Sequence, residues 1–209
     1  MDMNNIPENL KEALYHGREE VYLEYKGNVA WSDKVKMLEI VQTIFALSNE
    51  RDGGIIVIGV KDDGTREGLS DENYNSYSHD QINQYLNNRG NQPVQCKVEK
   101  IEHKDIEDKR LKKFVFIQVS ESKEFPLVYV GRQESKNEDA PAKNSNIGLR
   151  TGALYIRNKL NNGNKEVTRT DEWQELIERT YKKFEKETIR RFSIIKSEEI
   201  NPFDKELKI

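Results

Sequence analysis

Two short segments of the chain each place complementary side chains on one side of a predicted strand. In EVYLEYKG, from residue 20 to 27, polar and apolar residues alternate, so Glu24 and Lys26 point together, away from the apolar face. A carboxylate and an ammonium so placed could act on a substrate. They could equally form a same-side ion pair worth roughly a few tenths of a kcal/mol.

The second segment is ALYIR, in which Tyr155 and Arg157 share one face of a strand. An aromatic ring beside a guanidinium could stack on a base and grip a phosphate. Lys159, Lys165 and Arg169 would extend the positive charge beyond this strand. The alternative is that Tyr155 is a half-buried sheet residue and that the basic side chains are merely solvated.

Other common chemistries find little support in the sequence. Cys96 is the only cysteine, which excludes a disulfide within the chain and a thiolate zinc site. The three histidines are scattered, without the spacing of metal ligands. Gly54 and Gly59 have the spacing of a phosphate-binding loop, but Val60 and Lys61 follow them and the residues between them read as a strand, so ATP binding is the less favoured interpretation.

Alternating helices and strands must position these residues. Apolar residues at helical spacing predict four helices, at 7–16, 32–49, 78–87 and 170–191. Alternating or β-branched runs predict six strands, at 20–27, 55–60, 94–103, 112–120, 125–130 and 153–157, and residues 65–77 are predicted to be a loop. The expected fold is α+β, with a single mixed or antiparallel β-sheet, flanking helices and a long C-terminal helix. We expect one domain over 1–192, with a mobile polar loop at 131–152, and a tail over 193–209.

Composition and charge limit the classes of function. The most apolar run, at 55–60, is far shorter than the roughly 18 residues needed to span a membrane, and the N-terminus lacks a signal pattern, which predicts a cytoplasmic protein without membrane contact. Residues 1–80 contain 8 basic and 16 acidic side chains, whereas 131–169 contain 8 basic and 4 acidic ones. Such asymmetry indicates a basic surface for a polyanion, or simply a solvated loop and strand edge.

Three segments in order resemble the Schlafen AlbA-type domain. They are VYLEYK, then IVQTIFALSNERDGGIIVIGVKDDGTREGL, then GALYIRNK before the last helix. The likeness spans about residues 10–185. Its specific part is the middle segment, which combines Ala46, Asn49, Gly53, Gly54, Gly59, Asp62, Gly64 and Gly68 within 23 positions.

The resemblance implies a chemistry for four side chains. Nuclease members of the Schlafen family use three acidic residues, which correspond here to Glu19, Glu24 and Asp62, with Lys26 beside them. Such carboxylates would hold Mg²⁺ or Mn²⁺ against a scissile phosphate and lower the pKa of an attacking water, while Lys26 would offset developing charge. The alternative is that Glu24 and Lys26 form an ion pair and that Asp62 is an ordinary turn residue.

The function predicted from the sequence is binding of RNA or single-stranded nucleic acid, extended by a metal-dependent endoribonuclease activity if the carboxylates are catalytic. The alternative is a non-catalytic DNA-binding or regulatory module, and a protein-interaction domain is a third class. The nuclease members have two such lobes in one chain, so a homodimer would rebuild their clamp, through the apolar side of the 171–191 helix or an exposed sheet edge.

Overall fold

The structure is a computed structural model that describes residues 6–123, 125–132, 134–135 and 147–199. The chain divides into two compact units. The first comprises Met1–Ser122 and Pro126–Val167, and the second Lys123–Phe125 and Thr168–Ile209. Each unit is described by itself.

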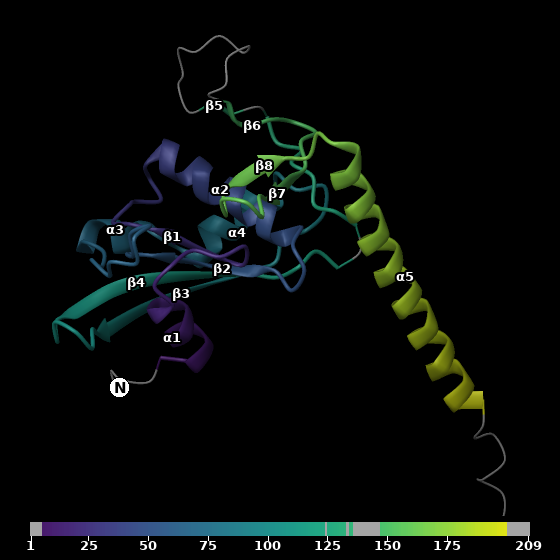
Figure 1. Cartoon of the computed structure of the whole chain (residues 1–209), viewed down its shortest axis with the longest axis horizontal. Coiled ribbons are helices and arrows are strands. Elements are labelled where there is room, and N and C mark those ends of the chain that lie inside the picture. Colours follow the sequence, from purple (N-terminus) through teal and green to yellow (C-terminus); the bar gives the residue numbers. More distant parts are fainter. Residues whose placement is uncertain (1–5, 124, 133, 136–146, 200–209) are drawn as a thin grey trace, which may run out of the picture. The chain divides into compact units, whose positions relative to one another are not determined.

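The first unit is built on a four-stranded mixed sheet with the strand order β1-β2-β4-β3 (Figure 1). Its strands are β1 (Leu23–Lys26), β2 (Gly54–Ile58), β3 (Cys96–Lys104) and β4 (Leu111–Val119). β1 and β2 run parallel, whereas β4 is antiparallel to both β2 and β3. Two small antiparallel pairs stand apart from this sheet: β5 (Glu134–Ser135) with β6 (Ile147–Leu149), and β7 (Tyr155–Arg157) with β8 (Asn164–Glu166). The α+β class with a mixed sheet and flanking helices is therefore confirmed.

Helices cover both faces of the sheet (Figure 1). They are α1 (Glu8–Tyr15), α2 (Lys34–Ser48), α3 (Asp71–Ser76) and α4 (His79–Asn87). The side chains of α1 pack with Val57, Phe114 and Phe116 in one core cluster. Alternate residues of the same strands, such as Ile56 and Ile117, face α2 and α4 in the other cluster. Burial of β2 on both faces agrees with its β-branched sequence.

Several boundaries differ from the predictions. Helix α2 begins at Lys34, two positions after the predicted start at 32, because the Asp33 carboxylate caps it by accepting hydrogen bonds from the backbone N–H groups of Val35 and Lys36. The predicted loop at 65–77 contains α3. The predicted strand at 125–130 forms only isolated bridges, from Tyr129 to Gly90 and from Val128 to Leu154. Within the predicted loop at 131–152, positions 133 and 136–146 lie outside the described residues.

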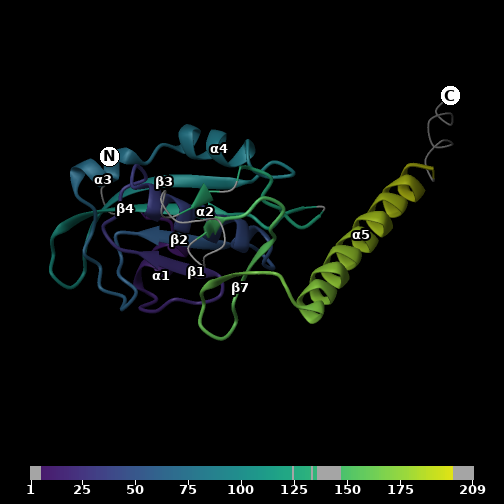
Figure 2. The ribbon, with the colours of Figure 1, turned by 90° about the horizontal axis from the view of Figure 1, so that it is seen from above.

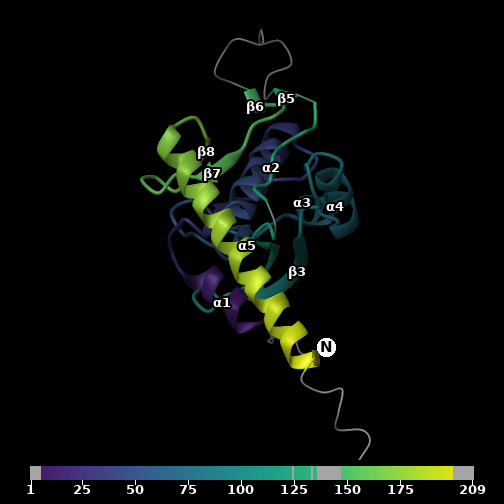
Figure 3. The ribbon, with the colours of Figure 1, turned by 90° about the vertical axis from the view of Figure 1, so that its right-hand side faces the viewer.

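The second unit contains α5 (Thr170–Glu199), one uninterrupted helix of 30 residues (Figure 3). The helix includes 193–199, which the sequence assigned to a tail, and 200–209 lie outside the described residues. Among the helices that the structure describes, none has the length and apolar character needed to cross a membrane.

Candidate functional site

The central side chain of the site, Glu24, lies on β1 and is only 6% exposed. The sequence placed it on a solvent-facing side of the strand, and this expectation was wrong. That side is covered because Arg157 of β7 reaches it: guanidinium Nη2 donates to Glu24 Oε2 at 2.6 Å. Arg157 itself is 1% exposed. Burial of both charges is tolerated because they satisfy one another.

The remaining donors of Arg157 are also engaged. Nη1 donates to Asn164 Oδ1 at 2.7 Å, and Nε donates to the backbone oxygen of Val21 at 3.1 Å. Nη2 also approaches the backbone oxygen of Glu20 at 3.4 Å. The guanidinium therefore ties β7 and β8 to the segment that leads into β1.

Lys26 occupies the other oxygen of the central carboxylate. Its Nζ donates to Glu24 Oε1 and, at 3.1 Å, to the backbone oxygen of Tyr25. Both oxygens of Glu24 are thus bonded to cationic donors. The same-side ion pair expected between Glu24 and Lys26 is present, although it is largely buried rather than exposed.

Glu19 and Asp62 complete an electrostatic cluster around Glu24. Glu19 is half-buried, and its Oε1 accepts a hydrogen bond from the backbone N–H of Tyr25 at 2.9 Å. Burial raises the pKa of Glu19 above its ordinary value, and the negative charges of Glu24 and Asp62 contribute in the same direction. The turn with Asp62 is held close by Gly64, where an added Cβ would lie 2.5 Å from the backbone oxygen of Gly17. The three predicted acidic residues are therefore electrostatically coupled.

This cluster does not fit a divalent cation as it stands. A Mg²⁺ or Mn²⁺ site needs carboxylates whose negative charge faces the metal, but two cations, Arg157 and Lys26, already compensate the charge of Glu24. Over the described ranges, no three His, Cys, Asp or Glu side chains are arranged to hold a metal ion. The arrangement instead links the first strand of the sheet to a late strand pair.

Tyr155 and Arg157 do share one face of β7, but that face is the inner one. Tyr155 is 3% exposed, and its hydroxyl accepts a hydrogen bond from the backbone N–H of Arg150 at 2.7 Å. Burial raises the pKa of Tyr155. Neither side chain is accessible to a nucleic acid in this conformation. Lys159 is exposed and Lys165 half-buried in the first unit.

The last of the predicted basic residues, Arg169, belongs to the second unit. It is exposed and pairs with Asp171, with Nε and Oδ1 3.0 Å apart. The five predicted binding residues therefore do not form one surface within a single unit.

Two buried residues that sequence reasoning left without a role also support the site. The side chain of Asn49 accepts from the backbone N–H of Leu127 at 2.7 Å and donates to the backbone oxygens of Leu127 and Tyr155. Glu50 Oε1 accepts from the backbone N–H of Arg157 at 3.1 Å. Both follow α2, where the N-x-x-x-G-G segment at 49–54 was the available signal.

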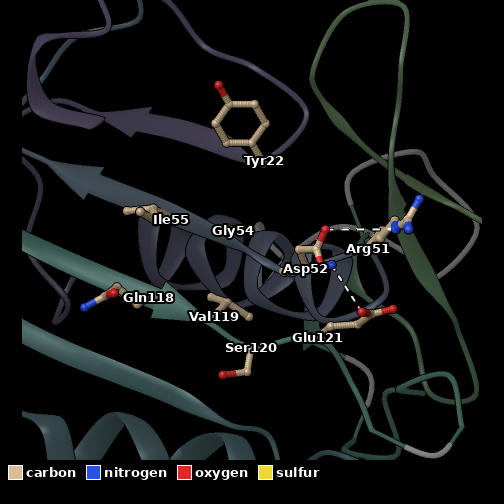
Figure 4. Close-up of a pocket in the computed structure, with 10 residues that line it drawn as sticks. Tyr22, Arg51, Asp52, Gly54, Ile55, Gln118, Val119, Ser120 and Glu121 are labelled. Carbon is tan, nitrogen blue, oxygen red and sulfur yellow. Dashed lines mark hydrogen bonds and ion pairs between the residues drawn. The ribbon is translucent and has the colours of Figure 1, made fainter. Parts of the chain in front are cut away.

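An open cavity of 680 Å³ lies at the start of β2 and the end of β4 (Figure 4). Tyr22 and Ile55 provide apolar surface, and Arg51 forms an ion pair with Asp52 on its rim. The backbone N–H of Asp52 donates to Glu121 Oε2 at 3.1 Å. One arginine beside two carboxylates gives this cavity little complementarity to a polyanion.

The fold and the site together define a class of α+β domain, in which a late strand delivers an arginine to a buried glutamate on the first strand of a mixed sheet. The chain belongs to the Schlafen AlbA_2 family, whose model matches residues 19–168. This confirms the resemblance inferred from the sequence. Family membership connects the chain with a nucleic-acid-related function and specifies no activity.

Two further comparisons were made. A search of solved structures found similarity to the DIP2311 protein from Corynebacterium diphtheriae, with 12% sequence identity and a TM-score of 0.47. The match covers 79% of this chain and 27% of that chain, so this chain spans about a quarter of that protein's length. The comparison with curated proteins gave no match.

Proposed function

We propose that this chain is a non-catalytic nucleic-acid-binding module in which the carboxylate cluster serves the fold. One observation supports the structural role above all others: both oxygens of Glu24 are bonded, to Arg157 and to Lys26. A buried carboxylate held between two cations is a poor ligand for a third cation and a poor proton acceptor, because its charge is already neutralised. The link with nucleic acids comes from the family to which the chain belongs.

In this proposal, nucleic acid is bound by exposed Lys and Arg side chains and not by the residues of β7. Phosphate contacts from Lys and Arg supply most of the sequence-independent affinity for a nucleic acid, and they make that affinity depend on salt. Tyr155 and Arg157 cannot contribute because they are buried. We therefore expect affinity that falls steeply as salt rises and that needs no divalent cation.

The test is a binding and cleavage assay on the purified full chain. Labelled transfer RNA, single-stranded DNA and duplex DNA would be incubated with Mn²⁺, Mg²⁺ or EDTA, and complexes and products would be separated. We expect complexes in all three buffers and no products. Absence of binding to every probe at low salt would overturn the proposal and indicate a protein-interaction domain instead.

A metal-dependent endoribonuclease is the second candidate, because Glu19, Glu24 and Asp62 are electrostatically coupled. In this candidate the three carboxylates would hold Mg²⁺ or Mn²⁺, with Lys26 beside them, once Arg157 had released Glu24. The exposed Asp62 provides the discriminating variant. Asp62→Ala should abolish cleavage and preserve affinity if the candidate is right, whereas Asp63→Ala, one position along the same turn, should leave both unchanged.

We also propose that the chain forms a homodimer through α5. Along this helix, Trp173, Ile177, Tyr181 and Phe184 recur at helical spacing and are 43–70% exposed. A two-fold contact between two such stripes would bury apolar surface on both copies. It would also bring two domains together, as the two lobes of the nuclease members are brought together in one chain.

A further inference from the structure

The connection between β3 and β4 is the most distinctive unassigned feature of the first unit. The two strands are nine residues long and pair over their whole length, from Cys96 opposite Val119 to Lys104 opposite Leu111. The connection, 105–110, lies at the end of the unit, where the two-stranded ribbon extends past α1 and α3 (Figures 1 and 2). The sequence predicted only the strands on either side of it, at 94–103 and 112–120, and assigned the connection no role.

The tip of this ribbon is held in place by a buried carboxylate. Asp105 is 2% exposed, and its Oδ2 lies 3.1 Å from both Arg66 Nε and Lys112 Nζ. Lys112 Nζ also donates to the backbone oxygen of Arg66 at 2.6 Å, and the Arg66 guanidinium lies 4.6 Å from the centre of the Tyr15 ring. These contacts fix the tip to the loop after β2, so its side chains are presented from a rigid base.

The same network neutralises the acidic residues of the tip. Arg66 pairs with Asp105 and Glu107, and Lys112 pairs with Asp105 and Asp108. Two cations therefore neutralise two of the three carboxylates. The tip nonetheless keeps an excess of positive charge, because three further cations lie beside this network.

These three cations are Lys104, Lys109 and Arg110. All three side chains are exposed, and none forms an ion pair with an acidic residue that the structure describes. Counted with the network, the tip has five basic and three acidic side chains, a net charge of +2. Cations that are already paired gain little from a phosphate, whereas these three are free to contact one.

Two aliphatic side chains accompany the free cations. Ile106 and Leu111 are each 54% exposed. Leu111 lies directly opposite Lys104 in the ladder and so shares a face of the ribbon with it. Exposed aliphatic side chains next to unpaired cations suit the major groove of DNA, where phosphates flank the base edges and the thymine methyl group is an apolar contact.

We propose that the tip of the β3–β4 ribbon is the surface that binds nucleic acid, and that its ligand is duplex DNA. The inference rests on the proposed function and deepens it. A two-stranded ribbon fits the major groove of B-form DNA, whereas the major groove of A-form RNA is too deep and narrow for protein side chains. Lys104, Lys109 and Arg110 contact phosphates, and Ile106 and Leu111 contact the groove.

The test compares two triple variants of the full chain that each remove three positive charges. One is Lys104→Gln/Lys109→Gln/Arg110→Gln. The matched control is Lys159→Gln/Lys165→Gln/Arg169→Gln, drawn from the basic residues that the sequence favoured. Affinities for a duplex DNA, a duplex RNA and a single strand of one sequence would be measured by fluorescence anisotropy at several salt concentrations, with thermal melting to show that each variant is folded.

We expect the ribbon variant to bind duplex DNA at least tenfold more weakly at low salt. The slope of log affinity against log salt should become shallower by roughly 2–3, because each phosphate contact contributes about 0.9 to that slope. The control should keep the affinity and slope of the native protein. Ile106→Ser/Leu111→Ser should weaken binding without changing the slope.

The outcomes separate this inference from the function on which it rests. If the ribbon variant binds as tightly as the native protein, the inference fails while the proposed function stands. If the native protein prefers duplex RNA or the single strand, the choice of duplex DNA is overturned. If the native protein binds none of the three probes, the proposed function fails as well.

Discussion

At the scale of single residues, the pair formed by Glu24 and Arg157 should dominate the stability of the site. Removing Arg157 leaves Lys26 as the one counterion of the buried Glu24 and takes away the donors to Glu24 Oε2 and Asn164, and breaking a buried pair in this way costs up to roughly 3–5 kcal/mol. We expect Arg157→Met to lower the free energy of unfolding by about that amount in urea denaturation. Glu24→Gln/Arg157→Met should be less destabilised than the sum of its single variants, because removing both partners leaves neither Arg157 nor Glu24 as an uncompensated buried charge, although Lys26 loses its carboxylate partner.

A matched control for this prediction is Arg150→Met. Arg150 pairs with Glu166, and its side chain is 51% exposed. Loss of an exposed ion pair changes stability by less than about 1 kcal/mol. Equal losses in Arg150→Met and Arg157→Met would contradict the view that burial gives the Glu24 pair its importance.

Glu19 should give the stability of the protein a measurable pH dependence. Its raised pKa means that folding favours the protonated carboxyl, so the ionised form costs stability at neutral pH. That cost is absent below the ordinary value of 4.5 and grows as the pH rises through the raised pKa. Glu19→Gln, which can still accept the bond from Tyr25, should therefore be more stable than the native protein at pH 7 and no more stable at pH 3.

The measurement is a series of urea denaturation curves across that pH range, with Glu12→Gln as the control. Glu12 is exposed on α1, outside the carboxylate cluster. A constant difference between Glu19→Gln and the native protein at every pH would show that the carboxyl of Glu19 has an ordinary pKa.

Sequence reasoning recognised the residues of this site but not their surroundings. Alternation correctly predicted that Tyr155 and Arg157 share one face and that Glu24 and Lys26 share another. Alternation gives the period of a strand and not what covers each face. The two polar faces are turned toward one another in the fold, which converts the predicted solvent-facing side chains into a buried ion pair. That pairing joins positions 133 residues apart in the chain.

At the scale of elements, the turn from α2 into β2 depends on Gly53. Its φ is +74°, and an added Cβ would lie 2.0 Å from the backbone oxygen of Val119. Left-handed backbone alone costs a non-glycine residue roughly 1–2 kcal/mol, and a clash with backbone atoms cannot be relieved by a side-chain rotation. Gly53→Ala should therefore destabilise the fold by more than about 2 kcal/mol in urea denaturation.

Gly152→Ala isolates the contribution of backbone strain. Gly152 has a similar φ of +80°, but nothing lies within 4 Å of an added Cβ. We expect it to cost only the roughly 1–2 kcal/mol of the left-handed conformation. Should the two variants lose the same stability, the close approach of Gly53 to β4 would have no energetic weight.

The predicted elements were confirmed where the hydrophobic pattern was strong and missed where it was not. The alternating runs at 94–103 and 112–120 correspond closely to β3 and β4. Helix α3 escaped prediction because its six residues, DENYNS, include no apolar stripe, and Ser70 alone marks its start. The run at 125–130 looked like a strand, but the side chain of Asn49 satisfies the backbone of Leu127 in place of a ladder.

At the scale of the whole molecule, charge totals identified an asymmetry but not the surface that uses it. The excess of basic residues over 131–169 includes Arg150 and Arg157, which pair with Glu166 and Glu24. Conversely, basic and acidic residues are nearly equal in number at the β3–β4 tip, yet three of its cations have no acidic partner among the described residues. Pairing depends on tertiary contacts, so a count along the sequence cannot separate occupied from available charge.

The proposed homodimer makes the last prediction, since α5 has apolar side chains along one side of a helix that is polar elsewhere. We expect the native protein to have the mass of a dimer in light scattering at micromolar concentration. Ile177→Glu/Phe184→Glu should convert it to a monomer, because carboxylates buried in an apolar contact are strongly disfavoured. Both positions are more than 60% exposed, so the substitutions should not disturb the fold of the helix.

Lys182→Glu is the control, because Lys182 is on α5 and interacts with Glu178 rather than with the apolar side chains. The control should remain dimeric. A dimer would have two β3–β4 ribbons that could bind one duplex. The monomeric variant should therefore bind DNA more weakly, although each ribbon still makes the same contacts with DNA. If the native protein is already monomeric, α5 is not a dimer contact. A single ribbon would then have to account for the whole affinity of the chain for DNA.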